Sequence, residues 1–187
     1  MEVAFKKQYS ILKQAIWQIK NEEGLDFSYD SYGLNFKNVL ASRYITLKDC
    51  GSINHNTGCV ITNENEAFSH YKGFSGNTLN RYYFDDGGFV ANDGTVFFLE
   101  QGSQAKDQTG YLVSIDINGY SKGPNVMGKD FFMFQITTDG EVLPMGAPNT
   151  YFYNAQKAYC SKKSADSFSG YTCAYFAATD KDYFKKL

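Results

Sequence analysis

Apolar residues recur along the N-terminal segment at the spacing of one helical face. Five of them follow a 4-3-4-3 pattern, which lays a single stripe along an amphipathic α-helix. They are Phe5, Tyr9, Leu12, Ile16 and Ile19. Lysines occupy other faces of this helix, and Gly24 is a typical stop signal. The pattern predicts a helix over residues 3–20.

Further along, the helical pattern gives way to strands. A short second helix is expected at about 35–44. Over residues 62–86 the apolar positions show no clear period, so no helix or strand is predicted there. Runs rich in β-branched and aromatic residues then alternate with glycine turns, and Asn92-Asp93-Gly94 between two of them is a strong hairpin signal. The predicted strands are 89–91, 95–99, 111–117, 131–136 and 141–143. Together they indicate an antiparallel meander.

A sheet with one buried face needs a cover, and the N-terminal helix has the only long apolar stripe. Asn149 or Thr150 can cap a last helix that ends at Tyr159. We therefore predict an α+β fold in which an N-terminal amphipathic helix packs on an antiparallel β-sheet. The single domain, 1–187, divides into a helix (1–23), a helix and loop region (24–86), the sheet (87–145) and a C-terminal helix with a disulfide-bounded region (146–187).

The four cysteines form two near pairs, Cys50 with Cys59 and Cys160 with Cys173. Each pair encloses a short polar loop, which favours two local disulfides among the three connectivities that four cysteines allow. A zinc site would need closer spacings within each pair. Disulfides predict a location in the periplasm or outside the cell.

Charge and motifs exclude several classes of function. The net charge is -2, and the 18 Lys and Arg residues are scattered, which argues against a nucleic-acid partner. The sequence contains no run of about 18 apolar residues, the length that a membrane-spanning helix needs. The two histidines, His55 and His70, lie near no nucleophile in the sequence, and phosphate loops and serine elbows are absent. We expect no enzymatic activity.

Oxygen ligands concentrate in the loop 116–130. Asp116, Asn118 and Asp130, with backbone carbonyls, can supply the six to eight oxygens that Ca²⁺ takes. The loop does not follow the EF-hand pattern, because Ser121 and Met127 stand where Gly and Glu are needed. The alternative is an Asx-type turn in which Asn118-Gly119 supplies positive φ. No cofactor is expected beyond a calcium ion at this loop.

Aromatic residues make up 17% of the chain, with 15 Tyr among them. Exposed aromatic rings can stack on sugars, so a secreted carbohydrate-binding or adhesive module is the alternative function. Tyr71, Tyr82 and Tyr83 are its candidate platforms. Trp17, beside the helical stripe, is expected to be packed.

The order of these elements resembles the prepilin-type proteins of type IV pili and type II secretion systems. The resemblance rests on three stretches that cover most of the chain. They are the helix 6–16, the loop and strands Asp116-Ile-Asn-Gly…Lys-Gly-Pro-Asn…Gly-Lys-Asp-Phe-Phe-Met-Phe134 with Thr138-Asp-Gly-Glu-Val-Leu-Pro144, and the ending Gly170-Tyr-Thr-Cys-Ala174 with Lys181-Asp-Tyr-Phe-Lys185. The family's leader-peptidase site and opening hydrophobic half-helix are not in this sequence, so the resemblance implies a head domain without its membrane anchor.

That resemblance implies a non-enzymatic pseudopilin or minor pilin subunit of a filament. Its partners would be other pilin-like subunits, and the missing segment would anchor it in the inner membrane before assembly. The location would be the bacterial envelope, as periplasmic protein or extracellular filament. A pilin also divides the helical stripe: its C-terminal half covers the sheet, whereas Phe5 and Tyr9 stay partly exposed as an assembly surface.

Overall fold

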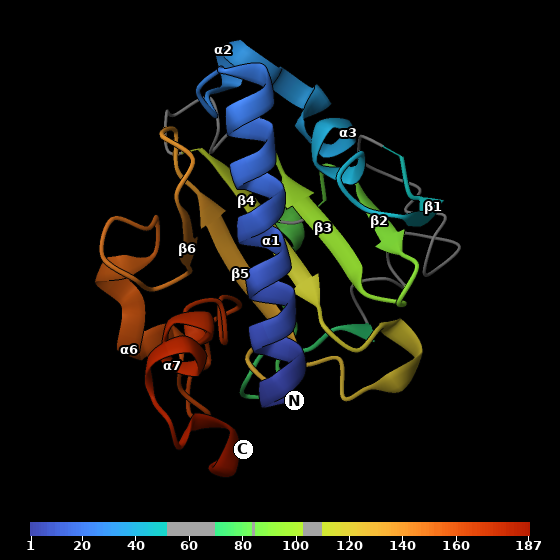
Figure 1. The fold of residues 1–187 in the computed structure, drawn as a ribbon. Helices are drawn as coiled ribbons and strands as arrows, with labels where there is room; N and C mark the ends of the chain where they lie inside the picture. Colours follow the sequence, from blue (N-terminus) through green and yellow to red (C-terminus); the bar gives the residue numbers. More distant parts are fainter. Residues whose placement is uncertain (52–69, 84, 103–109) are drawn as a thin grey trace.

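A computed structural model describes residues 1–51, 70–83, 85–102 and 110–187. Helix α1 (Glu2–Glu23) lies across one face of a six-stranded antiparallel sheet whose spatial order follows the chain, β1-β2-β3-β4-β5-β6 (Figure 1). The strands are β1 (Thr46–Asp49), β2 (Gly88–Ala91), β3 (Val96–Glu100), β4 (Tyr111–Asp116), β5 (Phe131–Ile136) and β6 (Val142–Pro144). The predicted α+β class and antiparallel meander are confirmed.

The strand β1 was not expected, and all four of its residues are exposed. An exposed edge strand lacks the alternating burial by which a strand is recognised. The connection between α1 and the sheet also contains α2 (Tyr29–Tyr32), η1 (Gly33–Asn35) and α3 (Phe36–Ala41). The last of these corresponds to the predicted second helix.

The apolar face of α1 is buried along its length. Leu12, Ile16 and Ile19 are all at most 1% exposed, as the sequence predicted. The side-chain amide of Gln8 reaches the β2–β3 turn, where it donates to Thr95 Oγ1 at 2.8 Å. Gly24 ends the helix in the left-handed conformation, with φ 65° and its N–H bonded to the Lys20 carbonyl.

The expected division of the helical stripe was wrong for Phe5, which is only 1% exposed. Its ring packs edge-on against Phe132 at 4.7 Å between centroids and lies 5.7 Å from Phe184. The C-terminal turn η5 (Tyr183–Lys185) brings Phe184 over the first turn of α1, so that end is covered within the monomer. Tyr9 is half-buried, with its ring stacked on Phe134 at 5.1 Å.

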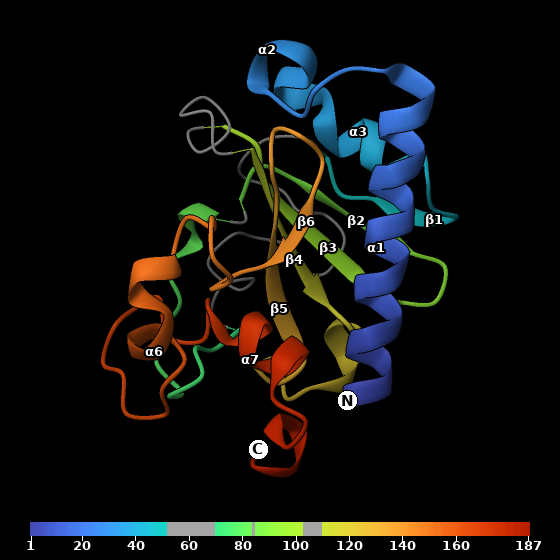
Figure 2. The same cartoon turned by 60° about the vertical axis from the view of Figure 1, so that its left-hand side comes forward.

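The sheet is buried on both faces, whereas only one buried face was expected. Figure 2 shows α1 on one side of the sheet, and η2 (Arg81–Tyr83) and α6 (Gln156–Tyr159) on the other. The second face carries its own apolar cluster, in which chain segments without regular structure supply most of the cover. Its members include Tyr71, Leu79, Phe98, Leu112, Met127, Phe131, Met133, Met145, Phe152 and Tyr171. Tyr71 and Tyr171 are therefore core residues.

The C-terminal region differs in detail from the prediction. The expected last helix is reduced to η4 (Tyr153–Ala155) and α6, while α7 (Cys173–Thr179) was missed. The predicted Cys160–Cys173 disulfide is confirmed, with a Cα–Cα distance of 4.9 Å. Cys59 and His55 lie outside the described residues. The predicted pairing of Cys50 with Cys59 therefore also lies outside the described part of the chain.

Across the described ranges, no helix combines the length and apolar character needed to cross a membrane.

The burial of the apolar face of α1 predicts which substitutions destabilise the domain. Ile16→Ala should lower the free energy of unfolding by about 2–5 kcal/mol and Phe5→Ala by about 3–5 kcal/mol, since both remove buried side-chain volume. Val3 is 82% exposed, so Val3→Ala should change it by less than about 0.5 kcal/mol. Urea denaturation of the three variants measures this. A Phe5→Ala curve that overlays the Val3→Ala curve would contradict the packing described here.

Candidate functional site

The loop between β4 and β5 brings the three predicted calcium ligands together, since the Asn118 N–H bonds to Asp116 and the Asn118 side chain lies beside Asp130. Asp116 ends β4 and pairs in register with Phe131, the residue after Asp130, so the loop between them closes on itself. Asp116 and Asp130 are both fully buried, and Asn118 is half-buried. Burial, together with the charge of Asp130, raises the pKa of Asp116 to about 6, and burial also raises the pKa of Asp130.

Each oxygen of this carboxylate pair accepts a hydrogen bond from the protein. Asp116 Oδ1 accepts from the backbone N–H of Asn118 and Gly119, and its Oδ2 accepts the Tyr71 hydroxyl at 2.8 Å. Asp130 accepts the N–H of Asn125 and Val126, both at 2.8 Å. These contacts favour the Asx-turn interpretation of the loop, because a Ca²⁺ ion would have to displace or share these donors.

The hydrogen bonds predict that calcium does not stabilise the protein. Thermal melts in millimolar CaCl₂ and in chelator should give the same melting temperature, since a ligand that binds the folded state raises it by mass action. Magnesium at the same ionic strength is the control. A rise with Ca²⁺ alone, abolished in Asp130→Asn, would restore the metal site.

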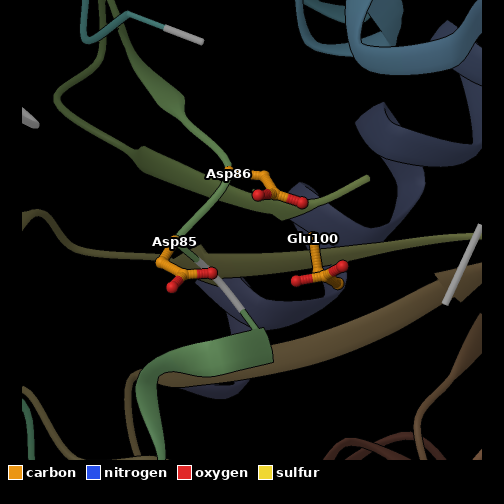
Figure 3. Close-up of side chains that lie close together, drawn as sticks. All are labelled: Asp85, Asp86 and Glu100. Atoms are coloured by element: carbon orange, nitrogen blue, oxygen red, sulfur yellow. The ribbon is translucent and has the colours of Figure 1, made fainter. Parts of the chain in front are cut away.

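A second cluster, of three carboxylates, lies where β3 ends at Glu100. The start of β3 is the end nearer to Asp116, which pairs with Val96. Asp85, Asp86 and Glu100 each present an oxygen within 4.8 Å of the others, and their side chains converge in Figure 3. Asp86 Oδ2 accepts the backbone N–H of Gln101 at 2.9 Å, and Glu100 Oε1 accepts that of Gly102 at 3.1 Å. The sequence did not reveal this group. Its signals in the sequence are the adjacent Asp85 and Asp86, which by sequence alone are most simply solvated surface, and a glutamate that ends an otherwise apolar strand.

Electrostatics set the chemistry of this carboxylate group. Glu100 is 3% exposed, and burial, reinforced by the charges of Asp86 and Asp85, raises its pKa to about 8. At neutral pH its carboxyl group therefore keeps a proton. Three carboxylates at this spacing can also take a hard divalent cation, which would have to displace that proton.

The raised pKa makes folding stability depend on pH. The ordinary pKa of 4.5 is lower than the folded value of about 8, so the stabilisation is complete below the first and lost as pH rises through the second. Between about pH 4.5 and pH 8 the free energy of unfolding should fall and then level off, and Glu100→Gln should flatten that slope because its amide does not titrate. The exposed Glu141→Gln is the control. An unchanged slope in Glu100→Gln would contradict this.

The candidate sugar platforms have different environments. Tyr71 is only 2% exposed and donates its hydroxyl to Asp116, so it presents no ring face to a ligand. Tyr83 is half-buried among other aromatic rings, 5.1 Å from Phe152. Tyr82 is 65% exposed. Of the three, only Tyr82 offers a largely open ring.

The expectation that Trp17 is packed was wrong, since it is 66% exposed. One residue past Ile16 is a turn of about 100° around the helix, which carries the indole off the apolar face. There it borders a groove of about 470 Å³ along α1. The groove is lined by Lys6, Tyr9, Ser10, Lys13, Gln14 and Trp17.

Among the residues that the structure describes, His70 contacts only groups of its own surrounding loops and rings. Its imidazole lies 3.2 Å from the Tyr120 carbonyl and contacts the side chain of Asn125, which ties it to the loop. Both are loop contacts, and neither provides a nucleophile. Comparison with known proteins finds no matching family model, no matching curated protein and no matching solved structure.

Proposed function

We propose that this chain is the head of a type IV pilin-like subunit, a pseudopilin or minor pilin, whose role is assembly into a filament rather than catalysis. One observation carries the proposal. A 22-residue N-terminal helix lies across a meander whose strands follow chain order, and a disulfide-bounded region closes the domain. This is the arrangement that the sequence resemblance implied.

The burial of Phe5 removes one argument from this proposal. The expected assembly surface of Phe5 and Tyr9 does not exist as such, because Phe5 faces the sheet. Exposed apolar side chains on α1 are instead Val3 and Trp17, on the side turned away from the sheet. The proposal therefore rests on the element order and on this outer face. Its location would be the bacterial envelope, with anchoring in the inner membrane before assembly.

The exposure of Tyr82, Tyr151 and Tyr153 favours a second candidate, a secreted carbohydrate-binding or adhesive module. Open tyrosine rings are the groups that stack on sugars. Glycan-array binding that is lost in Tyr82→Ala, in a protein that never enters a filament, would support this candidate over the first.

Fractionation of the cells that make the protein tests the proposed function. Surface filaments sheared from the cells should contain the chain, and gold-labelled antibody against it should mark filaments in electron micrographs. Ile16→Ala should reduce the amount of the chain in this fraction because it destabilises the head, whereas Val3→Ala should leave the head folded. Recovery of the chain only as a free secreted monomer would contradict the proposal.

A further inference from the structure

The outer face of α1 is basic and aromatic. At about 100° per residue, Val3, Ser10, Gln14 and Trp17 lie within about 60° of one another and opposite the buried stripe. Beside them the Lys13 ammonium lies 5.4 Å from the centre of the Tyr9 ring. No carboxylate lines the groove here, although Glu2, one turn from Lys6, bonds it at 2.6 Å.

This surface continues into a neighbouring hollow of about 370 Å³ between α1 and β6. The hollow shares Tyr9, Lys13 and Trp17 with the groove and adds Lys20, whose ammonium donates to the Asp139 carbonyl. Glu141 is its one acidic lining residue. The two hollows together form a surface, here called the front, with Trp17 at its centre.

The opposite side of the sheet carries a second aromatic surface, with two acidic residues beside it. Tyr82, Tyr151 and Tyr153 are each more than 40% exposed, and the ring of Tyr83 lies 6.0 Å from that of Tyr151. Asp85 and Asp86, both half-buried, lie two and three residues after Tyr83 in the chain. These tyrosines and the two aspartates are here called the back. Figure 2 places α1 and η2 on opposite sides of the sheet.

We propose that the front of one copy binds the back of the next, with Trp17 and Lys13 against Tyr82 and Asp85. This inference rests on the proposed filament function and names the contact that makes it. Two different surfaces of one chain that fit each other form a heterologous contact, and repetition of such a contact gives an open filament where the rotation between copies does not close into a ring. Tryptophan and tyrosine at the centre supply the contact energy, and the opposite charges fix the orientation.

Complementation between two variants tests the contact. The front variant is Lys13→Ala with Trp17→Ala, and the back variant is Asp85→Ala with Tyr82→Ala. In sedimentation velocity, wild-type chains should self-associate, more weakly as salt rises. Each variant alone should remain monomeric. Their equimolar mixture should form heterodimers and stop there, because each pair retains one intact front and one intact back.

Lys163→Glu, at an exposed lysine on neither surface, is the control and should associate like wild type. Thermal melts of all variants check that each is folded. A monomeric wild type at the highest soluble concentration overturns the contact, as does association of either variant alone or a mixture without heterodimers. Sheared filaments that still contain both variants would refute this contact and leave the filament function standing. Absence of the wild-type chain from filaments would refute that function instead.

Discussion

The contact between α1 and the centre of the sheet is the interaction on which the rest of the structure depends. Phe5, Leu12, Ile16 and Ile19 cover the aromatic face of β4 and β5, and the Gln8 amide ties the helix to the β2–β3 turn. Because the helix spans the sheet, the residues of its apolar stripe are buried within the monomer. A contact between α1 and another molecule must therefore use the outer face of the helix, and Trp17 is the large exposed side chain on that face.

Much of the fold was predictable, because the spacing of apolar residues along the chain indicates which positions are buried. The stripe over 3–20 identified α1, and the β-branched and aromatic runs on either side of Asp93-Gly94 identified the β2–β3 hairpin. The edge strand β1 and the short C-terminal helices were not predictable, since they have neither strong period nor sufficient length. The second buried face was missed for another reason. Its cover comes from irregular segments around Tyr71 and Phe152, and no local pattern shows that such segments pack on a sheet.

The candidate site was harder to read from the sequence. Asp116 and Asp130 flank a loop rich in oxygen ligands, but the sequence cannot show that backbone N–H groups occupy their carboxylates. Glu100 meets Asp85 and Asp86 only through the pairing of β3 with the chain before β2. The exposure of Trp17 follows from its helical phase relative to Ile16, a signal that was present in the sequence. A tryptophan beside an apolar stripe is simply more often packed.

The central claim is that copies of this chain assemble through distinct front and back surfaces. Zero-length carboxyl–amine cross-linking of an equal mixture of ¹⁴N- and ¹⁵N-labelled chains measures this most directly, because a mixed-isotope peptide pair identifies a link between two molecules. The account predicts mixed pairs that join Lys13 to Asp85 or Asp86. Only same-isotope pairs, or mixed pairs that join Lys13 to another surface, would contradict it.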